Sequence, residues 1–380
     1  MSNMIKLGDV ATYINGYAFK PEDRGEEGLP IIRIQDLTGN AYDLGFYNGE
    51  YPEKIGINDG DVLISWSASL GVYVWNRGKA LLNQHIFKVM FDKAEIDKNY
   101  FVYAVRQKLD EMGRKTHGAT MKHIVKKDFD ATQIPYPSLE EQSEIAANLD
   151  KVSNVIENRK QELQLLDTLI KARFVEMFGN PVINEKRWRQ KSLGEITTKI
   201  GSGATPKGGK GAYQEEGITL IRSMNVHNGL FEYRELAHIS DEQAAKLDNV
   251  AIEENDVLLN ITGASVARSC VVPNKILPAR VNQHVCIIRC KEYINPVFLN
   301  KLLIDDNYQD LLWSVAGAGA TREAITKQQV ESLQIIMPPV ELQNEFMRFC
   351  NQVDKSKVAV QKALDETQLL FDSLMQQYFG

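Results

Sequence analysis

Hydrophobic positions along the chain follow two alternating patterns, and each pattern occurs twice. The globular segments at residues 1–138 and 191–337 contain short apolar runs rich in β-branched and aromatic residues, such as "DVLISW" and "HIFKVMF". Turn dipeptides such as Asn48-Gly49 separate these runs, which therefore predict short β-strands. Each segment also carries a helical pattern near its end, "NYFVYAVRQKLDEM" in the first and "PVFLNKLLIDDNYQDLL" in the second. Both segments are expected to be mixed α/β domains.

The second pattern predicts one long helix after each globular segment. Apolar residues recur there in alternating steps of four and three, which is coiled-coil spacing, and two prolines precede each helix. About 40 residues of helix span roughly 60 Å. The residues expected to pack along the two seams are Ile145, Leu149, Val152, Ile156, Leu163, Leu166 and Ile170, and then Leu342, Phe346, Phe349, Val353, Val360, Leu370 and Leu374.

The two halves of the chain repeat each other. The segment "HGATMKHIVKKDFDATQIPYPSLEEQ" at residues 117–142 matches "AGATREAITKQQVESLQIIMPPVELQ" at residues 318–343, at an offset of 201. Shorter matches include "GDVLIS" with "NDVLLN" and "NQHIF" with "NQHVC". The offset grows from 186 near the start of each half to 201 and then stays constant to the end. The chain is therefore an internal duplication whose insertions lie in the globular segments.

The duplication predicts the architecture. We expect an α+β fold with two tandem mixed α/β domains and two long helices that form an antiparallel coiled coil, related by pseudo-two-fold symmetry. The alternative is that each helix packs back on its own domain. The expected boundaries are a first domain at 1–138, a first helix at 139–179, a linker at 180–190, a second domain at 191–337 and a second helix at 338–380.

Composition is that of a globular protein of more than one domain. The chain has 380 residues, of which 25% are charged, and only four are cysteines. The cysteines form no disulfide-like pattern, which favours a reducing, cytoplasmic location. No apolar run is long enough to span a membrane, and the polar start is unlike a signal peptide.

Motifs for catalysis are not found in the sequence. "MPPVE" lacks the polar residue before the prolines and the aromatic residue after them that an adenine methyltransferase loop needs. "GSGATPKGGKG" departs from a phosphate-binding loop, because Ala204 stands at the first glycine and Gly211 at the Ser/Thr position. No nucleophile elbow, dinucleotide fingerprint or Pro-Asp dipeptide is present either. We therefore predict no catalytic residue.

His284, Cys286 and Cys290, which are residue types that bind zinc, share one face of a predicted strand. The first copy has Phe87 and Phe91 at the two cysteine positions. This substitution favours buried core cysteines over metal ligands, so no metal site is predicted.

The charge distribution qualifies the net charge of −6. Most of the net negative charge lies in residues 139–179 and 338–380, and residues 62–91 and 257–291 contain no acidic residue at all. These acid-free segments, and the basic stretch around the first Gly-Ala-Thr, are typical of a phosphate-binding surface. The alternative is a solvated basic loop beside a buried strand.

The order of the repeated motifs resembles the specificity subunit of type I restriction-modification systems over essentially the whole chain. These motifs are Leu-Gly, an Ile-Arg strand, Gly-Asp-Val-Leu, Asn-Gln-His, and Gly-Ala-Thr-Arg-x-x-Ile before Pro-Pro-x-x-x-Gln. The first copy departs from the pattern, with Met121 and Lys122 where the second copy has Arg322 and Glu323. The departure puts the anion contacts of the first copy in doubt.

The resemblance implies that each globular half is a target recognition domain for one part of a bipartite double-stranded DNA target. It further implies that the helices dock two methyltransferase subunits, and that motor-nuclease subunits join the complex. S-adenosylmethionine, ATP and magnesium are then expected in the partners, and this chain is expected to be non-catalytic and without a cofactor. Two alternatives are the detached recognition module of a fused methyltransferase-nuclease and a helical adaptor that binds only protein.

Candidate DNA contacts follow from the resemblance and from the basic and aromatic residues, since base edges are read in the major groove and cations hold phosphates. The candidates are Lys20, Arg33, Trp66, Ser67, Arg77, Lys79, Lys115, Thr120, Lys122, Lys126, Lys207, Arg222, Thr262, Arg268, Lys275, Thr321 and Arg322. The threonines of the Gly-Ala-Thr turns either bond a phosphate or close the turn. Asn83-Gln84 and Asn282-Gln283 either read adenine or order a loop.

Overall fold

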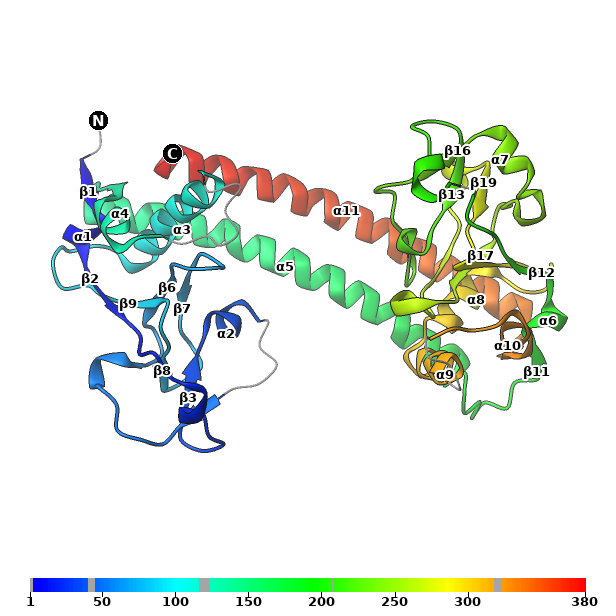
Figure 1. Ribbon diagram of the computed structural model, residues 1–380, viewed down its shortest axis with the longest axis horizontal. Helices are drawn as coiled ribbons and strands as arrows, with labels where there is room; N and C mark the ends of the chain where they lie inside the picture. The colour runs from blue at the N-terminus through cyan, green and yellow to red at the C-terminus, as the bar shows by residue number, and fades with distance from the viewer. Residues whose placement is uncertain (1–2, 40–44, 116–123, 207, 318–322) are drawn as a thin grey trace. The chain divides into compact units, whose positions relative to one another are not determined.

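A computed structural model of the chain describes all residues except 1–2, 40–44, 116–123, 207 and 318–322. The chain forms two compact units (Figure 1). Unit 1 comprises Met1–Lys160 and Lys362–Gly380, and unit 2 comprises Gln161–Gln361. Each unit thus contains one globular domain, the start of the long helix that follows this domain, and the end of the other long helix.

Two four-stranded sheets form the domain of unit 1. The first has the strand order β2-β9-β6-β7 with antiparallel neighbours, and the second has the order β4-β3-β8-β5, in which β3 and β8 are parallel. The strands are β1 (Met4–Lys6), β2 (Thr12–Asn15), β3 (Leu29–Ile32), β4 (Gly45–Tyr47), β5 (Gly56–Ile57), β6 (Val62–Ser65), β7 (Gly71–Val74), β8 (Ala80–Leu82), β9 (Ile86–Met90) and β10 (Gln133–Pro135). The helices are α1 (Leu7–Val10), α2 (Ile34–Thr38), α3 (Lys98–Lys115) and α4 (Lys126–Ala131). The predicted mixed α/β domain is confirmed.

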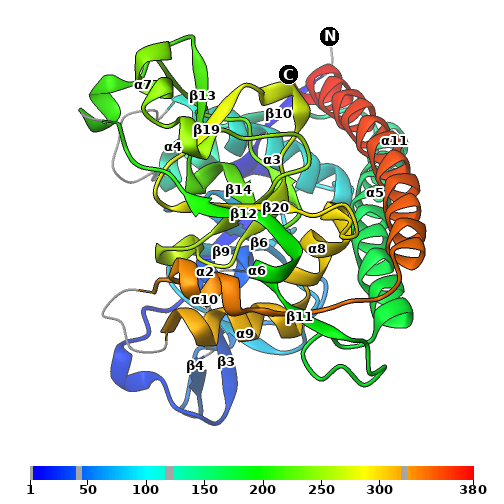
Figure 2. The ribbon, with the colours of Figure 1, turned by 90° about the vertical axis from the view of Figure 1, so that its right-hand side faces the viewer.

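Unit 2 repeats this order. Its sheets are β12-β20-β17-β18 and β16-β13-β19, and β13 and β19 are again parallel. Figure 2 shows β13 beside β19. The strands are β11 (Gln190–Ser192), β12 (Thr197–Ser202), β13 (Ile218–Ile221), β14 (Val226–His227), β15 (Leu230–Phe231), β16 (Ala237–Ile239), β17 (Val257–Asn260), β18 (Ser269–Val271), β19 (Ala279–Val281), β20 (Val285–Cys290) and β21 (Gln334–Ile336). The short helices are α6 (Leu193–Ile196), α7 (Asp241–Ala245), α8 (Pro296–Leu303), α9 (Asp306–Gly317) and α10 (Lys327–Ser332). The shared sheet order shows that the sequence duplication is a duplication of structure.

The predicted helical pattern at residues 296–312 is interrupted. It forms α8 and α9, and the break lies at Ile304 and Asp305. Asp305 Oδ1 accepts hydrogen bonds from the backbone N–H groups of Asn307 (3.0 Å) and Tyr308 (3.3 Å), so it caps the start of α9.

A two-stranded ribbon closes each domain just before its long helix. β1 pairs antiparallel with β10, and β11 pairs antiparallel with β21. The repeated Glu-x-Gln fixes the helix that follows. Gln142 accepts from Asp97 N and donates to Pro137 O, and Gln343 accepts from Asn295 N and donates to the carbonyl oxygen of Pro338, all at 2.9 Å. Both glutamines are buried, so the motif is structural.

The long helices have the predicted length. They are α5 (Leu139–Phe178) and α11 (Val340–Phe379), each of 40 residues. In unit 1 the start of α5 shares a core with the end of α11 and with α3, and in unit 2 the end of α5 shares a core with the start of α11 and with α8. The helices therefore run antiparallel within each unit. Packing between the helices and packing on a domain, stated above as alternatives, occur together.

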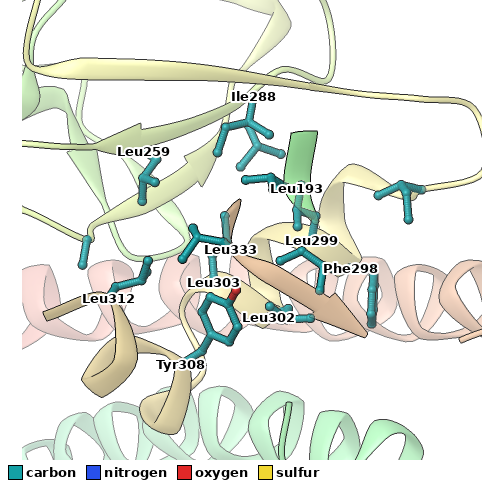
Figure 3. Packing of buried hydrophobic residues seen from close by; sticks show 14 of the residues in the cluster. Leu193, Leu259, Ile288, Phe298, Leu299, Leu302, Leu303, Tyr308, Leu312 and Leu333 are labelled. Atoms are coloured by element: carbon teal, nitrogen blue, oxygen red, sulfur yellow. The ribbon is translucent and has the colours of Figure 1, made fainter. Parts of the chain in front are cut away.

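The last phenylalanine of each long helix is fully buried. In unit 1 the ring of Phe379 lies 5.1 Å from that of Tyr100, and Lys108 Nζ donates to Phe379 O at 2.8 Å. In unit 2 the ring of Phe178 lies 4.8 Å from that of Phe298. Figure 3 shows Phe298 beside Leu299 and Leu302 within this core. Each long helix thus ends inside the core of the domain that it does not follow in sequence.

The prediction that Leu370 packs in the seam is wrong. Leu370 is 51% exposed, because regular steps from Val360 lead through Thr367 to Phe371, which packs on the core of unit 1. The buried seam residues are Leu149, Ile156, Ile170, Phe346, Val353 and Val360. The half-buried ones are Ile145, Val152, Leu163, Leu166, Leu342, Phe349 and Leu374.

The aspartate of the repeated Asp-Val-Leu motif is held by a cation in both domains. Asp256 has a fully buried side chain and accepts from Arg289 Nε at 2.8 Å and from Glu253 N at 2.8 Å. Asp61 accepts from Asn58 N and pairs with Lys88 at 2.9 Å. The two cations stand at different positions on equivalent strands. Lys88 lies opposite Leu63, whereas Arg289 is the next residue after the one opposite Val257. The requirement is therefore a positive charge near this carboxylate, whichever strand position supplies it.

The Phe379→Ala variant tests the helix anchor. We expect the free energy of unfolding to fall by about 3–5 kcal/mol, because a large buried ring is replaced by a cavity. Urea denaturation measures this loss. Leu369→Ala on the same helix is the control, since Leu369 is 69% exposed and should change stability by less than about 0.5 kcal/mol. Equal losses in the two variants would contradict the assignment.

Arg289→Met tests the buried carboxylate. We expect a loss of about 3–5 kcal/mol, because the variant leaves Asp256 charged and buried without its cation. Lys88→Met should cost about 1–2 kcal/mol, because the Asp61 side chain is 25% exposed and water can replace part of the interaction. Thermal and urea unfolding measure both losses. A larger loss for Lys88→Met would show that burial of the carboxylate does not set the cost.

Candidate nucleic-acid interface

The chain that follows each Gly-Ala-Thr turn returns to the same place in its domain. Ile124 N donates to Trp66 O at 2.9 Å, and Ile325 N donates to Ile261 O at 2.8 Å. Each turn is therefore followed by a segment bonded to the loop after β6 or β17. The turns themselves, and with them the candidates Thr120, Lys122, Lys207, Thr321 and Arg322, lie outside the described residues, as does the side chain of Lys115.

The Asn-Gln-His motif lies beside the same loop. Trp66 N donates to His85 O at 3.3 Å, and Ile261 N donates to His284 O at 3.0 Å. Two repeated motifs that are far apart in sequence thus meet at one loop in each domain.

The asparagine of this motif orders its own loop. Asn83 Oδ1 accepts from Gln84 N at 2.9 Å, and Asn282 Oδ1 accepts from His284 N at 3.0 Å. Both asparagines are buried, whereas Gln84 and Gln283 are exposed. The loop-ordering alternative therefore holds for the asparagines, and the glutamines remain available to a ligand.

A glycine near the start of each half allows a third segment to reach the same loop. A Cβ on Gly16 would lie 2.0 Å from Asn83 O, and a Cβ on Gly203 would lie 1.7 Å from Val281 O. Only glycine fits these close backbone approaches. Three repeated motifs therefore converge in each domain.

The surface at this convergence is aromatic in the first domain. The Trp66 ring lies 4.9 Å from that of His85 and stacks on that of Phe87 at 5.5 Å. Trp66 is half-buried, and the candidate Ser67 is buried at 8% exposure. Ser67 is therefore placed to shape the loop.

The same surface is polar in the second domain. Thr262, at the position that corresponds to Ser67, lies 2.5 Å through its Oγ1 from His284 Nδ1. Its backbone pairs with Ala324, and Gly263 N donates to Glu323 O at 2.9 Å. The candidate Thr262 thus joins the Asn-Gln-His loop to the segment after the second Gly-Ala-Thr turn.

Three candidate arginines brace loops. Arg33 Nε donates to Asp36 Oδ2 at 3.1 Å, and Arg77 donates to Asp36 O at 2.9 Å while its guanidinium lies over the Trp75 ring at 4.6 Å. In the second domain Arg222 donates to Glu235 O and lies 5.5 Å from the Tyr213 ring.

The remaining described candidates are lysines and Arg268. Lys126 pairs with Asp130 at 2.6 Å, and Lys275 lies over the Tyr233 ring at 3.8 Å. Lys20 is exposed and lies 3.8 Å from Glu22. Lys79 is exposed and lines a surface cleft of about 530 Å³ that also involves Lys54 and Lys88. The side chain of Arg268 has no bonding partner among the described residues, and its backbone bonds Asn260 at the end of β17.

Part of the positive charge inferred from the acid-free segments is neutralised in the fold. Lys88 pairs with Asp61, Arg280 with Asp248 (2.7 Å), and Arg289 with Asp256. Strand pairing brings these acids from neighbouring segments. The acid-free segments therefore overstate the number of free cations, because the acidic partners lie outside these segments in sequence but close to them in the fold.

The cysteines pack as apolar residues. Cys286 is 1% exposed, and burial raises the pKa of its thiol to about 12, so it stays protonated. Cys290 packs against the same core. Phe91 is 38% exposed, so the prediction that it is a core residue is wrong. Among the described residues no group of three His, Cys, Asp or Glu side chains is placed to hold a metal ion. None of the described helices combines the length and the apolar character that crossing a membrane requires.

Comparison with known proteins agrees with the duplicated fold. The family model described as the type I restriction modification DNA specificity domain matches residues 2–167 and again residues 185–367. The EcoBI specificity subunit of Escherichia coli is 25% identical, over 99% of this chain and 85% of that protein. The MjaVIII specificity subunit of Methanocaldococcus jannaschii is 22% identical, over 95% of this chain and 89% of that protein.

Solved structures show the same fold. The S subunit of a type I restriction-modification system from M. genitalium is 14% identical, with a TM-score of 0.57, over 100% of this chain and 96% of that chain. A chain from a structure of an assembled type I system is 17% identical, with a TM-score of 0.58, over 99% of this chain and 96% of that chain. Because the two family matches coincide with the two structural halves and cover most of the sequence, the chain belongs to the family of type I restriction-modification DNA specificity subunits and carries two recognition domains.

Proposed function

We propose that this chain is the non-catalytic specificity subunit of a type I restriction-modification complex and that each domain reads one part of a bipartite double-stranded DNA target. The observation that carries the proposal is the convergence of three repeated motifs on one loop in each domain. Loops held by a rigid scaffold are where binding residues are usually found. The candidate motifs for chemistry in this chain are instead explained by helix starts and core packing.

The two domains offer different chemistry at equivalent places. The aromatic surface of Trp66 and His85 suits apolar contact with bases or sugars, whereas Thr262 and His284 supply hydrogen-bonding groups. Base edges in the major groove differ in their donors, acceptors and methyl groups. Two such surfaces therefore support the reading of two unlike half-sites.

The long helices are the proposed docking surface for two methyltransferase subunits. Each unit exposes apolar helix residues that a solvated helix does not need. These are Leu165 (67%), Leu169 (46%) and Val358 (71%) in unit 2, and Val155 (40%), Leu369 (69%) and Leu370 (51%) in unit 1. The partner subunits, together with motor-nuclease subunits, would supply S-adenosylmethionine, ATP and magnesium. The equal lengths of α5 and α11 support a role in setting the spacing between half-sites.

Arg268→Ala tests phosphate contact beside the second recognition surface. We expect weaker DNA binding and a salt dependence that is lower by about one unit of slope, because one phosphate contact is lost. Binding is measured by gel shift over a series of salt concentrations, with and without the methyltransferase subunit. Arg348→Ala removes the same charge at an exposed place on α11, away from the loop after β17, and is the control for the measurement without the methyltransferase subunit. Equal effects of the two variants would assign the change to net charge alone.

Exchange of the first domain tests the bipartite model. Replacing residues 7–132 with the same region of a relative keeps the β1–β10 ribbon and both long helices. Tyr100 and Tyr103 should be retained in the chimaera, since they pack on α5 and α11. We expect one half-site to change and the other to stay the same, as measured by sequencing methylated sites in cells that carry the complex. A change in both half-sites would contradict independent reading by two domains.

A further inference from the structure

Gln283 belongs to a chain of four hydrogen-bonded polar side chains in the second domain. Thr205 Oγ1 donates to Gln283 Oε1, and Gln283 Nε2 lies 3.0 Å from His284 Nε2. His284 Nδ1 in turn lies 2.5 Å from Thr262 Oγ1. The four residues come from three loops: the glycine turn after β12, the Asn-Gln-His loop, and the loop after β17. Thr205 is not among the residues predicted from the sequence, although it lies in the segment that is equivalent to the start of the first half.

In the amide orientation that the structure has, the donors and acceptors in this chain follow one direction. An amide nitrogen can only donate, so His284 Nε2 accepts from Gln283. A neutral imidazole then carries its hydrogen on Nδ1, and Nδ1 donates to Thr262 Oγ1. With Thr205 donating to Oε1 and His284 accepting from Nε2, the oxygen and nitrogen ends of the Gln283 amide are distinguished.

The amide keeps unused hydrogen-bonding capacity. Its nitrogen has a second hydrogen and its oxygen has a second lone pair. Gln283 is exposed, so one donor and one acceptor are open to a ligand. In the major groove adenine presents an acceptor at N7 and a donor at N6, the complement that a glutamine amide recognises.

We propose that Gln283 reads an adenine in the half-site of the second domain, and that Thr205 and His284 are positioning residues that fix the orientation of its amide. This inference rests on the proposed function. The brace holds both ends of the amide, with Thr205 at Oε1 and His284 at Nε2. It also restricts the side-chain rotamers before DNA arrives, which lowers the entropy lost on binding.

The first domain provides a contrast. Gln84 occupies the equivalent position and is exposed, but its side chain has no hydrogen-bond partner among the described residues. The neighbouring His85 contacts the Trp66 ring instead. Gln84→Ala is therefore the matched control, because it makes the same substitution in the same motif of the other domain.

The test selects duplexes from a randomised DNA pool with the chain assembled with its methyltransferase subunits. Wild type should enrich a bipartite motif with an adenine in the second half-site. Gln283→Ala should reduce the preference for this one adenine by about ten- to a hundred-fold and leave the first half-site unchanged. Thr205→Val and His284→Phe should reduce the same preference by a smaller factor. Gln84→Ala should leave it intact.

Gln283→Glu gives a readout that a structural role would not produce. The carboxylate only accepts, so the preference at that position should move from adenine toward cytosine, whose N4 donates. Thermal unfolding of each variant confirms folding. If Gln283→Ala weakens all positions equally, or Gln283→Glu leaves the base preference unchanged, the inference is wrong while the proposed function stands. If wild type enriches no motif, the proposed function itself fails.

Discussion

The burial of Phe178 and Phe379 at the ends of α5 and α11 is the interaction on which each unit depends. Each ring completes the core of the domain that its own helix does not follow, and a domain without it would contain a cavity. The number of residues between the start of each helix and its terminal phenylalanine is therefore constrained. This explains why the offset between the two halves stays at 201 from the Gly-Ala-Thr turn onward, while it changes in the loops before that turn.

The repeated motifs serve the scaffold more than the surface. Asn83 and Asn282 each accept a hydrogen bond from the backbone of their own loop. Gln142 and Gln343 fix the starts of the long helices. Asp256 forms a buried ion pair. These groups are buried, where an unpaired polar atom is costly. Each of them therefore needs a hydrogen-bonding or charged partner in its own domain. Some residues near them differ between the halves, such as Trp66 in the first domain and Ile261 at the equivalent position in the second. A domain built in this way can change what it contacts without changing how it is held.

Sequence reasoning was accurate where the determining forces are local or periodic. Seams and prolines predicted both long helices to within two residues, and the core role of Cys286 followed from Phe87 in the other copy. It failed where partners come from distant segments. The exposure of Leu370 depends on the register at the end of α11. The neutralisation of Lys88 and Arg289 depends on strand pairing that no spacing reveals, and the same is true of the brace around Gln283.

Equivalent scaffolds with unequal surfaces suit the proposed reading of an asymmetric target. Trp66 with His85 in one domain and Thr262 with His284 in the other lie on the equivalent loops after β6 and β17, one position apart, yet one pair contacts through rings and the other through a hydrogen bond. Stability is shared, because each domain is completed by the helix that follows the other. Recognition, as proposed, is not shared, because the described backbone hydrogen bonds of the loops after β6 and β17 lie within their own domains. A substitution at an outer loop is therefore expected to alter one half-site alone, whereas loss of Phe379 removes support from the first domain, at the far end of the sequence.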